Sequence, residues 1–225
     1  MKKTGFLIFI FALAIGLAFS TNCSFGGFSN LSGVQGSGTS KSETRNVSGF
    51  TKIDAGGAIN IEVAAQKDFS VVVEADDNLL TNIKTEVSGD TLKIYSEDRI
   101  SPKTRINVVI SMPALEGLDI SGASSVNVAN VNADSLELKA SGASKIKIDG
   151  AAKELNADAS GASTIEAENL KVEDADVDAS GASKATVAAT NDLRVNASGA
   201  SKISYIGEPK NIKQNSSGAS SVTKK

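Results

Sequence analysis

The stretch that decides the fold is Leu136–Ile148, which reads LELKASGASKIKI. Apolar residues alternate with polar ones on both sides of its central Ser-Gly-Ala-Ser motif. This period of two is the signature of β-strands, whose successive side chains point to opposite faces. We therefore expect two short strands joined by a bend. Glycine suits the bend because it accepts backbone angles that a Cβ forbids, and the small alanine beside it is expected to point into the corner.

The same motif occurs six times, beginning at Ser121, Ser141, Ser160, Ser180, Ser198 and Ser217, so that the steps are 20, 19, 20, 18 and 19 residues. A fixed period in this range predicts stacked supersecondary units, none of which buries its apolar face alone. Each strand would pair with its equivalent one turn later, in coils of about 19 residues. The predicted corner glycines are Gly122, Gly142, Gly161, Gly181, Gly199 and Gly218.

The predicted fold class is all-β, a right-handed parallel β-helix, which is a solenoid. Right-handedness is favoured because no six-residue sub-repeat runs through the units and because parallel crossovers are overwhelmingly right-handed. The expected core consists of the aliphatic residues on the inward side of each strand: Leu118, Ile120, Val126, Val128, Leu136, Leu138, Ile146, Ile148, Leu155, Ile165, Val177, Val187, Leu193, Val195, Ile203 and Ile212.

The N-terminal segment, residues 1–22, has the pattern of a secretory signal peptide. Lys2 and Lys3 precede a short apolar run that ends in polar residues. The chain's only cysteine, Cys23, follows directly, in a position that resembles the lipobox of bacterial lipoproteins, although Asn22 stands where a smaller residue is usual. We expect Cys23 to be lipidated, with Ser24 favouring the outer membrane. The alternative is ordinary secretion after cleavage near Ser20.

The remaining chain divides by composition into two parts. Residues 23–43 are rich in Gly, Ser and Asn and are expected to form a flexible tether. Residues 44–225 are expected to form one β-helix domain. Within it, residues 44–117 would be an N-terminal capping part, because an open β-helix end exposes unpaired strand edges, and residues 118–222 would form the repeat coils.

An ordered set of motifs resembles the putative auto-transporter adhesin, head GIN domain family. The set comprises VSGFTKI at 47–53, GAINI at 57–61, Leu79-Leu80, LKI at 92–94 and LDISG at 118–122. The resemblance extends from about residue 44 to 222. It implies a secreted or lipid-anchored protein of the kind found in Bacteroidetes, a right-handed β-helix without the catalytic residues of pectin lyases, and a role in cell adhesion.

The residues offer little catalytic chemistry. The chain has no histidine, which removes the commonest general base. Ser-Lys pairs at Ser144-Lys145, Ser183-Lys184 and Ser201-Lys202 recur at equivalent positions, and such recurrence indicates architecture. We therefore expect no enzymatic activity, no catalytic residue and no cofactor.

The predicted register gives one polar cluster that could hold a metal. It stacks Lys139, Asp158, Asp178, Asn196 and Asn215 in one column, with Glu137, Asn156, Asp176, Arg194 and Lys213 two residues earlier. The oxygens of Asn156, Asp158, Asp176 and Asp178 are the kind of ligands that suit Ca²⁺. The alternative interpretation is a solvated acidic face.

The charge and the composition disfavour a nucleic-acid partner. Removing Lys2 and Lys3 with the signal peptide leaves 21 of the 23 basic residues against 26 acidic ones, a net charge of −5, and few aromatic residues remain for base stacking. The leading hypothesis is a cell-envelope lipoprotein whose β-helix is a non-catalytic adhesion or ligand-binding module, held to the membrane by its lipid and facing an unidentified extracellular or envelope ligand. The alternatives are a polysaccharide-active enzyme on the same scaffold and a rigid spacer without a ligand; without lipidation the protein would be secreted or periplasmic.

Overall fold

The alternating residues around each Ser-Gly-Ala-Ser motif form strands that pair in parallel with the same segment of the next coil. The computed structural model describes residues 33–225, which contain no α-helix and no helix long and apolar enough to cross a membrane. The strands of the repeat part are β10 (Gly117–Ile120), β11 (Ser125–Ala140), β12 (Lys145–Ala159), β13 (Thr164–Ala179), β14 (Lys184–Ala189), β15 (Asp192–Ala197), β16 (Lys202–Ile206), β17 (Asn211–Ser216) and β18 (Ser221–Lys224).

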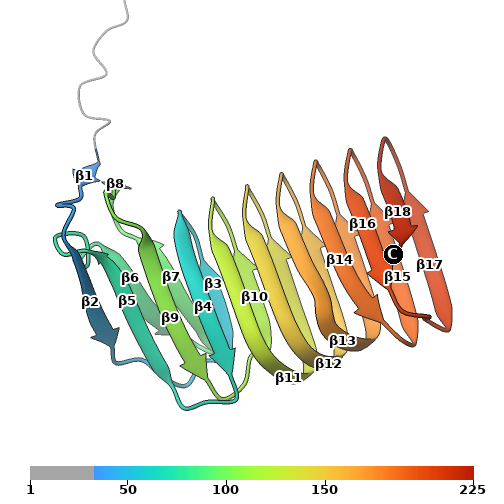
Figure 1. Cartoon of the computed structure of the whole chain (residues 1–225), viewed down its shortest axis with the longest axis horizontal. Helices are drawn as coiled ribbons and strands as arrows, with labels where there is room; N and C mark the ends of the chain where they lie inside the picture. Colours follow the sequence, from blue (N-terminus) through green and yellow to red (C-terminus); the bar gives the residue numbers. More distant parts are fainter. Residues whose placement is uncertain (1–32) are drawn as a thin grey trace, which may run out of the picture. The chain divides into compact units, whose positions relative to one another are not determined.

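Each coil has two faces, which meet at the Ser-Gly-Ala-Ser corner. Strand segments that lead into a corner form what we call the pre-corner face, made of β10, the C-terminal halves of β11, β12 and β13, then β15 and β17. Segments that leave a corner form the post-corner face, made of the N-terminal halves of β11, β12 and β13, then β14, β16 and β18. Figure 1 shows the corners aligned in a row along the solenoid.

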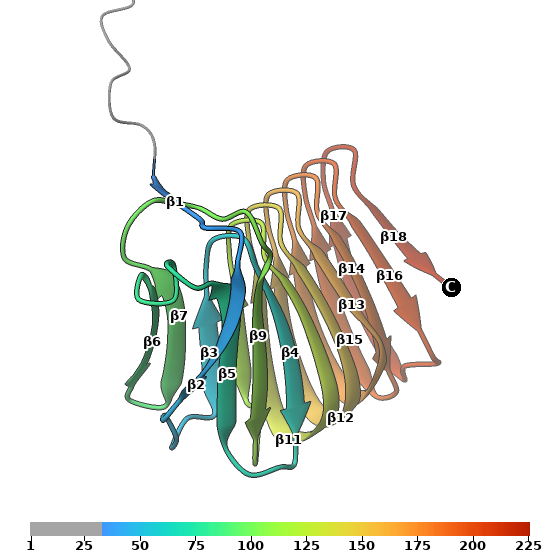
Figure 2. The same ribbon diagram turned by 60° about the vertical axis from the view of Figure 1, so that its left-hand side comes forward.

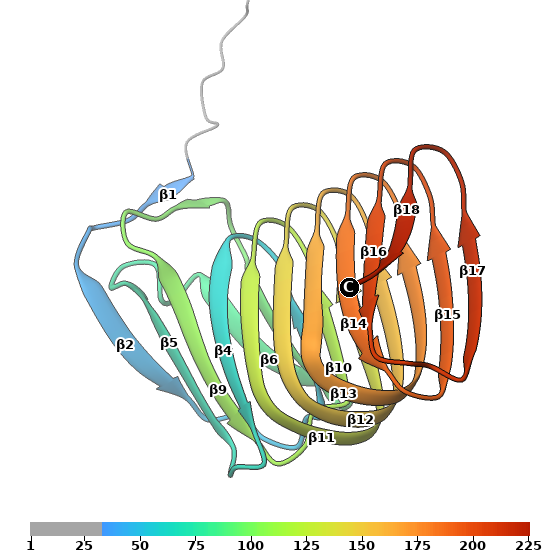
Figure 3. The same ribbon diagram turned by 45° about the vertical axis from the view of Figure 1, so that its right-hand side comes forward.

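The solenoid is right-handed. In Figure 3, where the C-terminal end comes forward, the chain rises along β17, crosses the corner and descends along β18. It therefore turns anticlockwise while it advances toward the viewer. The prediction of an all-β, right-handed parallel solenoid is confirmed.

The side of the coil opposite the corner is built in two ways. In the coils of β11, β12 and β13 the strand runs continuously around this bend, with register shifts between Val128 and Val131 and between Lys147 and Asp149. Asn130 bends the backbone with a φ of 64°, and its N–H donates to Asp149. A separate turn exists only in the later coils, between β14 and β15 and between β16 and β17.

The N-terminal part extends the solenoid and closes its end. Its strands are β1 (Val34–Gln35), β2 (Ser40–Arg45), β3 (Lys52–Ala55), β4 (Ile59–Ala65), β5 (Ser70–Asp76), β6 (Ile83–Ser88), β7 (Thr91–Ser96), β8 (Ile100–Ser101) and β9 (Ile106–Met112). The coil of β3 and β4 lies between β10 and β11 on one side and β7 and β9 on the other. The outermost strands β2, β5 and β6 run antiparallel to the strands they pair with (Figure 2). This end therefore does not present a parallel coil on which another chain could stack.

Ordered structure begins earlier than the expected tether boundary at residue 43. Strands β1 and β2 lie within or across that stretch, and a buried carboxylate holds the chain between them. Asp76 accepts hydrogen bonds from the backbone N–H groups of Gly38 at 2.7 Å, Lys103 at 2.8 Å and Thr104 at 3.2 Å. Burial alone would raise the pKa of Asp76, but these donors outweigh it and keep the pKa below its usual value.

The core positions were predicted correctly with one exception. The inward aliphatic residues from Leu118 to Ile203 are buried, whereas Ile212 is 41% exposed. Ile212 lies on β17, and the described residues place no further coil over it. The equivalent residue one coil earlier, Leu193, is 2% exposed because β17 covers it.

The corners are tighter than the sequence indicates. The glycine of each corner has a φ between 70° and 74°, and a Cβ on Gly161 would lie 2.7 Å from the carbonyl oxygen of Gly142 in the preceding coil. The following alanine, expected to point inward, is instead exposed in each repeat, and the fourth residue, serine, is buried in the five corners from Ser124 to Ser201. The side chain that points into the corner is therefore that of the fourth residue, serine, and not that of the alanine.

We predict that Gly161→Ala destabilises the domain by more than the conformational cost of a positive φ, which is about 1–2 kcal/mol. The matched control is Gly89→Ala in the β6–β7 hairpin, where φ is 65° but no atom lies within 4 Å of the new Cβ. Chemical denaturation of both variants measures the difference. Equal losses would contradict a steric role for the corner approach.

Candidate functional site

The structure separates two kinds of corner serine. The fourth serine of the motif donates its hydroxyl to the carbonyl of the residue that precedes the previous motif. Ser163 reaches Ala140 at 2.9 Å, Ser183 reaches Ala159 at 2.9 Å, and Ser201 reaches Ala179 at 3.0 Å. These buried bonds link successive coils, so the fourth serines are structural.

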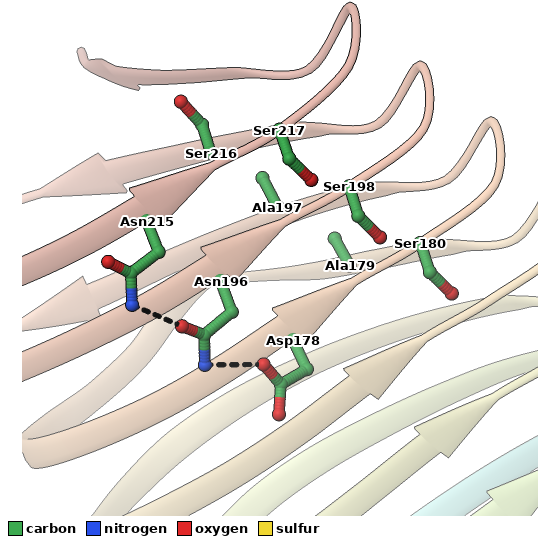
Figure 4. Close-up of a pocket in the computed structure, with 9 residues that line it drawn as sticks. All are labelled: Asp178, Ala179, Ser180, Asn196, Ala197, Ser198, Asn215, Ser216 and Ser217. Atoms are coloured by element: carbon green, nitrogen blue, oxygen red, sulfur yellow. Dashed lines mark hydrogen bonds between the residues drawn. The ribbon is translucent and has the colours of Figure 1, made fainter.

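The first serines of the last three corners are free. Within residues 33–225, the hydroxyls of Ser180, Ser198 and Ser217 make no hydrogen bond to another protein group. They line a hollow of about 240 Å³ on the pre-corner face, together with Asp178, Asn196, Asn215 and the residues between them. Figure 4 shows the three serines in a row beside the three polar side chains.

The polar side chains of this hollow form a ladder across three coils. The amide of Asn215 donates to Oδ1 of Asn196 at 3.0 Å, and the amide of Asn196 donates to Oδ1 of Asp178 at 2.7 Å. The register that brings them together was predicted from the repeat and is confirmed. We call the hollow with this ladder and the three free serines the ladder groove.

The ladder forms at this end because two successive coils carry asparagines, whose amides donate along the column to Asn196 and to Asp178. Earlier in the same column stand Asp158, which stacks on Asp178, and Lys139, which pairs with Glu137 at 2.6 Å. Burial raises the pKa of Asp158, and the neighbouring charge of Asp178 raises it further. Asparagines at the two later positions thus continue the column as a hydrogen-bonded ladder in which Asp178 is the one charged member.

The four candidate calcium ligands are neighbours, as the register predicted. Asn156 pairs with Asp176, and Asp158 with Asp178. Two of the oxygens already have partners, because Arg194 binds Asp176 at 2.9 Å and Asn196 binds Asp178. The described part of the chain contains no group of three or more His, Cys, Asp or Glu residues able to hold a metal ion.

The Ser-Lys pairs cannot act together as a nucleophile and a base. Strand alternation buries Ser183 and its equivalents, whereas Lys184 and the other lysines are exposed on the outer surface. Cys23, the predicted lipidation site, lies outside the described residues. The predicted corner glycines all lie in the corner row with positive φ.

Sequence reasoning missed the first corner of this row. Gly56-Gly57-Ala58-Ile59 occupies the position of Ser-Gly-Ala-Ser in the coil of β3 and β4, and the N–H of Ala123 donates to the carbonyl of Gly57 at 2.6 Å. The available signal was Gly-Ala followed by alternating residues. The GAINI stretch of the family resemblance is therefore a corner and the strand that leaves it.

A second hollow, of about 480 Å³, lies where residues 102–106 meet the first corner, and Asn60, Lys103 and Arg105 line it. The buried carboxylate of Asp76 sits directly behind the backbone of Lys103. Its negative charge opposes the attraction of these cations for an anion. This hollow is therefore the weaker candidate for a binding site.

Comparison with known proteins identifies the family. The family described as putative auto-transporter adhesin, head GIN domain, matches residues 49–209, and the chain belongs to it. This family is adhesin-like, which indicates an extracellular or cell-envelope protein. No curated protein matches the chain significantly.

Solved structures share the fold. A putative adhesin from Bacteroides fragilis is 21% identical, with a TM-score of 0.69 over 85% of this chain and 100% of that one. A putative adhesin from Parabacteroides distasonis is 24% identical, with a TM-score of 0.53 over 85% and 99%. A putative lipid binding protein from the same species is 21% identical, with a TM-score of 0.52 over 85% and 98%. At these identities the likeness establishes the solenoid alone.

We predict that the two kinds of corner serine respond differently to truncation. Ser183→Ala should lower the free energy of unfolding by about 1 kcal/mol, because it removes a buried hydrogen bond. Ser180→Ala, three residues earlier, should change it by less than about 0.5 kcal/mol. Urea denaturation measures both values. A larger loss of unfolding free energy for Ser180→Ala than for Ser183→Ala would contradict a structural role for the fourth serine.

We predict that Asp158→Asn stabilises the domain at pH 7 by a few tenths of a kcal/mol, up to about 1, because it relieves a like-charge pair that solvent partly screens. The raised pKa means that protonation favours the fold, so the gain should shrink as the pH falls through the folded pKa of Asp158. Asp134→Asn is the control of opposite sign, since Lys153 lowers the pKa of Asp134. Melting temperatures between pH 3 and 7 test this, and a gain that persists at the lowest pH would contradict it.

Proposed function

We propose that the protein is a lipid-anchored adhesion module of the bacterial cell envelope, which binds its ligand without catalysis through the ladder groove. The observation that carries this proposal is the row of open hydrogen-bonding groups at Ser180, Ser198 and Ser217 beside the ladder of Asp178, Asn196 and Asn215. On the same corners the buried hydroxyls of Ser183 and Ser201 serve the fold, whereas the first serines do not use theirs. The ladder groove is thus a surface whose polar groups remain available to a partner.

A catalytic role is less well supported by the same residues. The carboxylates of Asp158 and Asp178 stand side by side on neighbouring coils and point in the same direction. Carboxylates that cleave a glycosidic bond flank that bond on two sides. Asp178 is also held by Asn196, which fits a structural acceptor better than a nucleophile.

The order of the domain supports presentation of the groove away from the anchor. The chain enters the solenoid through β1 and β2 at one end, whereas the ladder groove involves β13, β15 and β17 at the other. Along the chain, the groove is therefore far from the proposed anchor at Cys23.

Adhesion should depend on the groove face. We expect Asn196→Arg, in the full chain expressed on a non-adherent bacterium, to reduce attachment to matrix-coated or glycan-coated surfaces at least fivefold, because the long cation fills the groove. The control is Asn127→Arg on the post-corner face, where the exposed amide of Asn127 likewise donates to a carboxylate one coil away, Glu62, at 2.8 Å. Equal attachment by both variants, at equal surface levels, would refute the groove as the binding surface.

Anchoring should depend on Cys23. Cells expressing the chain should incorporate labelled palmitate into it, and Cys23→Ala should abolish the label and release the protein from the membrane fraction. A protein that stays membrane-bound and labelled after this substitution would rule out the lipid anchor.

A further inference from the structure

The hydrogen-bonding groups of the ladder groove are of mixed character. Each free serine hydroxyl both donates and accepts, and every asparagine amide has a second N–H. Asn215 Oδ1 and Asp178 Oδ2 remain as open acceptors, since the ladder uses Nδ2 of Asn215 and Oδ1 of Asp178. Alternating donors and acceptors suit a ligand whose own groups do both, and hydroxyl groups are of that kind.

The charge of the groove selects against acidic ligands. Among its nine lining residues the one charged side chain is the carboxylate of Asp178, and no lysine or arginine is present. The nearby Arg194 is already bound to Asp176 at 2.9 Å. An acidic polymer would meet repulsion here without a compensating cation, so a neutral ligand fits better.

The groove also repeats. Its serines and ladder side chains recur on three successive coils, which are spaced about 4.8 Å apart along the solenoid axis. A long chain with regularly repeated hydroxyl groups can therefore lie along the axis and meet the same pair of groups on each coil. A compact small molecule would use only one or two of these rungs.

We propose that the ladder groove binds a neutral polysaccharide that lies along the solenoid axis, across β13, β15 and β17. The inference rests on the proposed binding role and names its ligand class. No aromatic ring lines the groove, so recognition comes from hydrogen bonds rather than from stacking. Contact on each coil is weak, and affinity grows with the number of coils that the polymer spans.

The test is an NMR titration of the soluble domain, residues 33–225, with dextran, mannan and xylan, and with polygalacturonate and a soluble peptide library as contrasts. At least one neutral polysaccharide should shift the backbone amides of Ser180, Ser198 and Ser217 and the side-chain amides of Asn196 and Asn215. Ser198→Ala should weaken that binding about fivefold, the loss of one hydrogen bond. Ser141→Ala is the matched control, because Ser141 holds the same corner position beside Lys139, outside the groove.

Both variants should fold normally, because neither hydroxyl has a partner within the described residues. The proposal is overturned if no neutral polysaccharide shifts these signals, if Ser198→Ala and Ser141→Ala bind equally well, or if polygalacturonate or peptide binds more tightly. If one of these results is found but Asn196→Arg still reduces cell attachment, the proposed ligand class is wrong and the proposed adhesion role is kept. If Asn196→Arg leaves attachment unchanged as well, both the ligand class and the adhesion role of the groove are wrong.

Discussion

The close approach of one corner to the next is the constraint on which the rest of this solenoid depends. At each corner the N–H of the alanine donates to the carbonyl of the glycine one coil earlier, at 2.6–2.8 Å, and the space where a Cβ would stand is filled by that carbonyl. Glycine is required there for two separate reasons, its positive φ and its lack of a side chain. The stacking distance of the coils is thereby fixed at the corner, and strand pairing follows on both faces.

A fixed corner also determines what the surface can do. Since successive coils stay in register, each outward position becomes a straight column of side chains, and its chemistry is set by which residues recur. Where Lys139, Asp158 and Glu137 occur, charges pair or repel along the column. Where Asn196 and Asn215 occur, amides join into a ladder and leave a hollow beside the corner serines. Binding properties can therefore change from coil to coil without a change in the fold.

The sequence alone predicted the solenoid, its period, its register and the main inward positions of its strands, because these follow from alternation and from a motif of fixed spacing. It did not predict Val131, Leu170 and Val172, which are buried around the bend opposite the corner. It did not predict which corner residue is buried. Small size made alanine the expected inward residue, but the inward position needs a donor for the carbonyl of the coil below, which serine supplies. The corner at Gly57 does not match the repeat motif, because Ile59 stands in the place of that serine.

The site was predictable only in part, for a similar reason. Register placed Asp178, Asn196 and Asn215 in one column, but the metal prediction used mainly the acidic residues, since carboxylates are metal ligands. Whether the corner hydroxyls are free or used depends on atoms one coil away, which no single repeat reveals. The exposure of Ile212 and the clamping of the chain before β2 by Asp76 likewise depend on which strands lie beside them.

Native-state hydrogen exchange at the corner alanines tests the central claim most directly. The side chains of Ala143, Ala162, Ala182 and Ala200 are exposed, so an ordinary surface turn would exchange their amide protons quickly. Because these amides bond to the glycine below, we predict protection comparable to that of the buried strands β11, β12 and β13. Exchange as fast as at the hairpin tip around Gly89 would show that the corners do not hold the coils together.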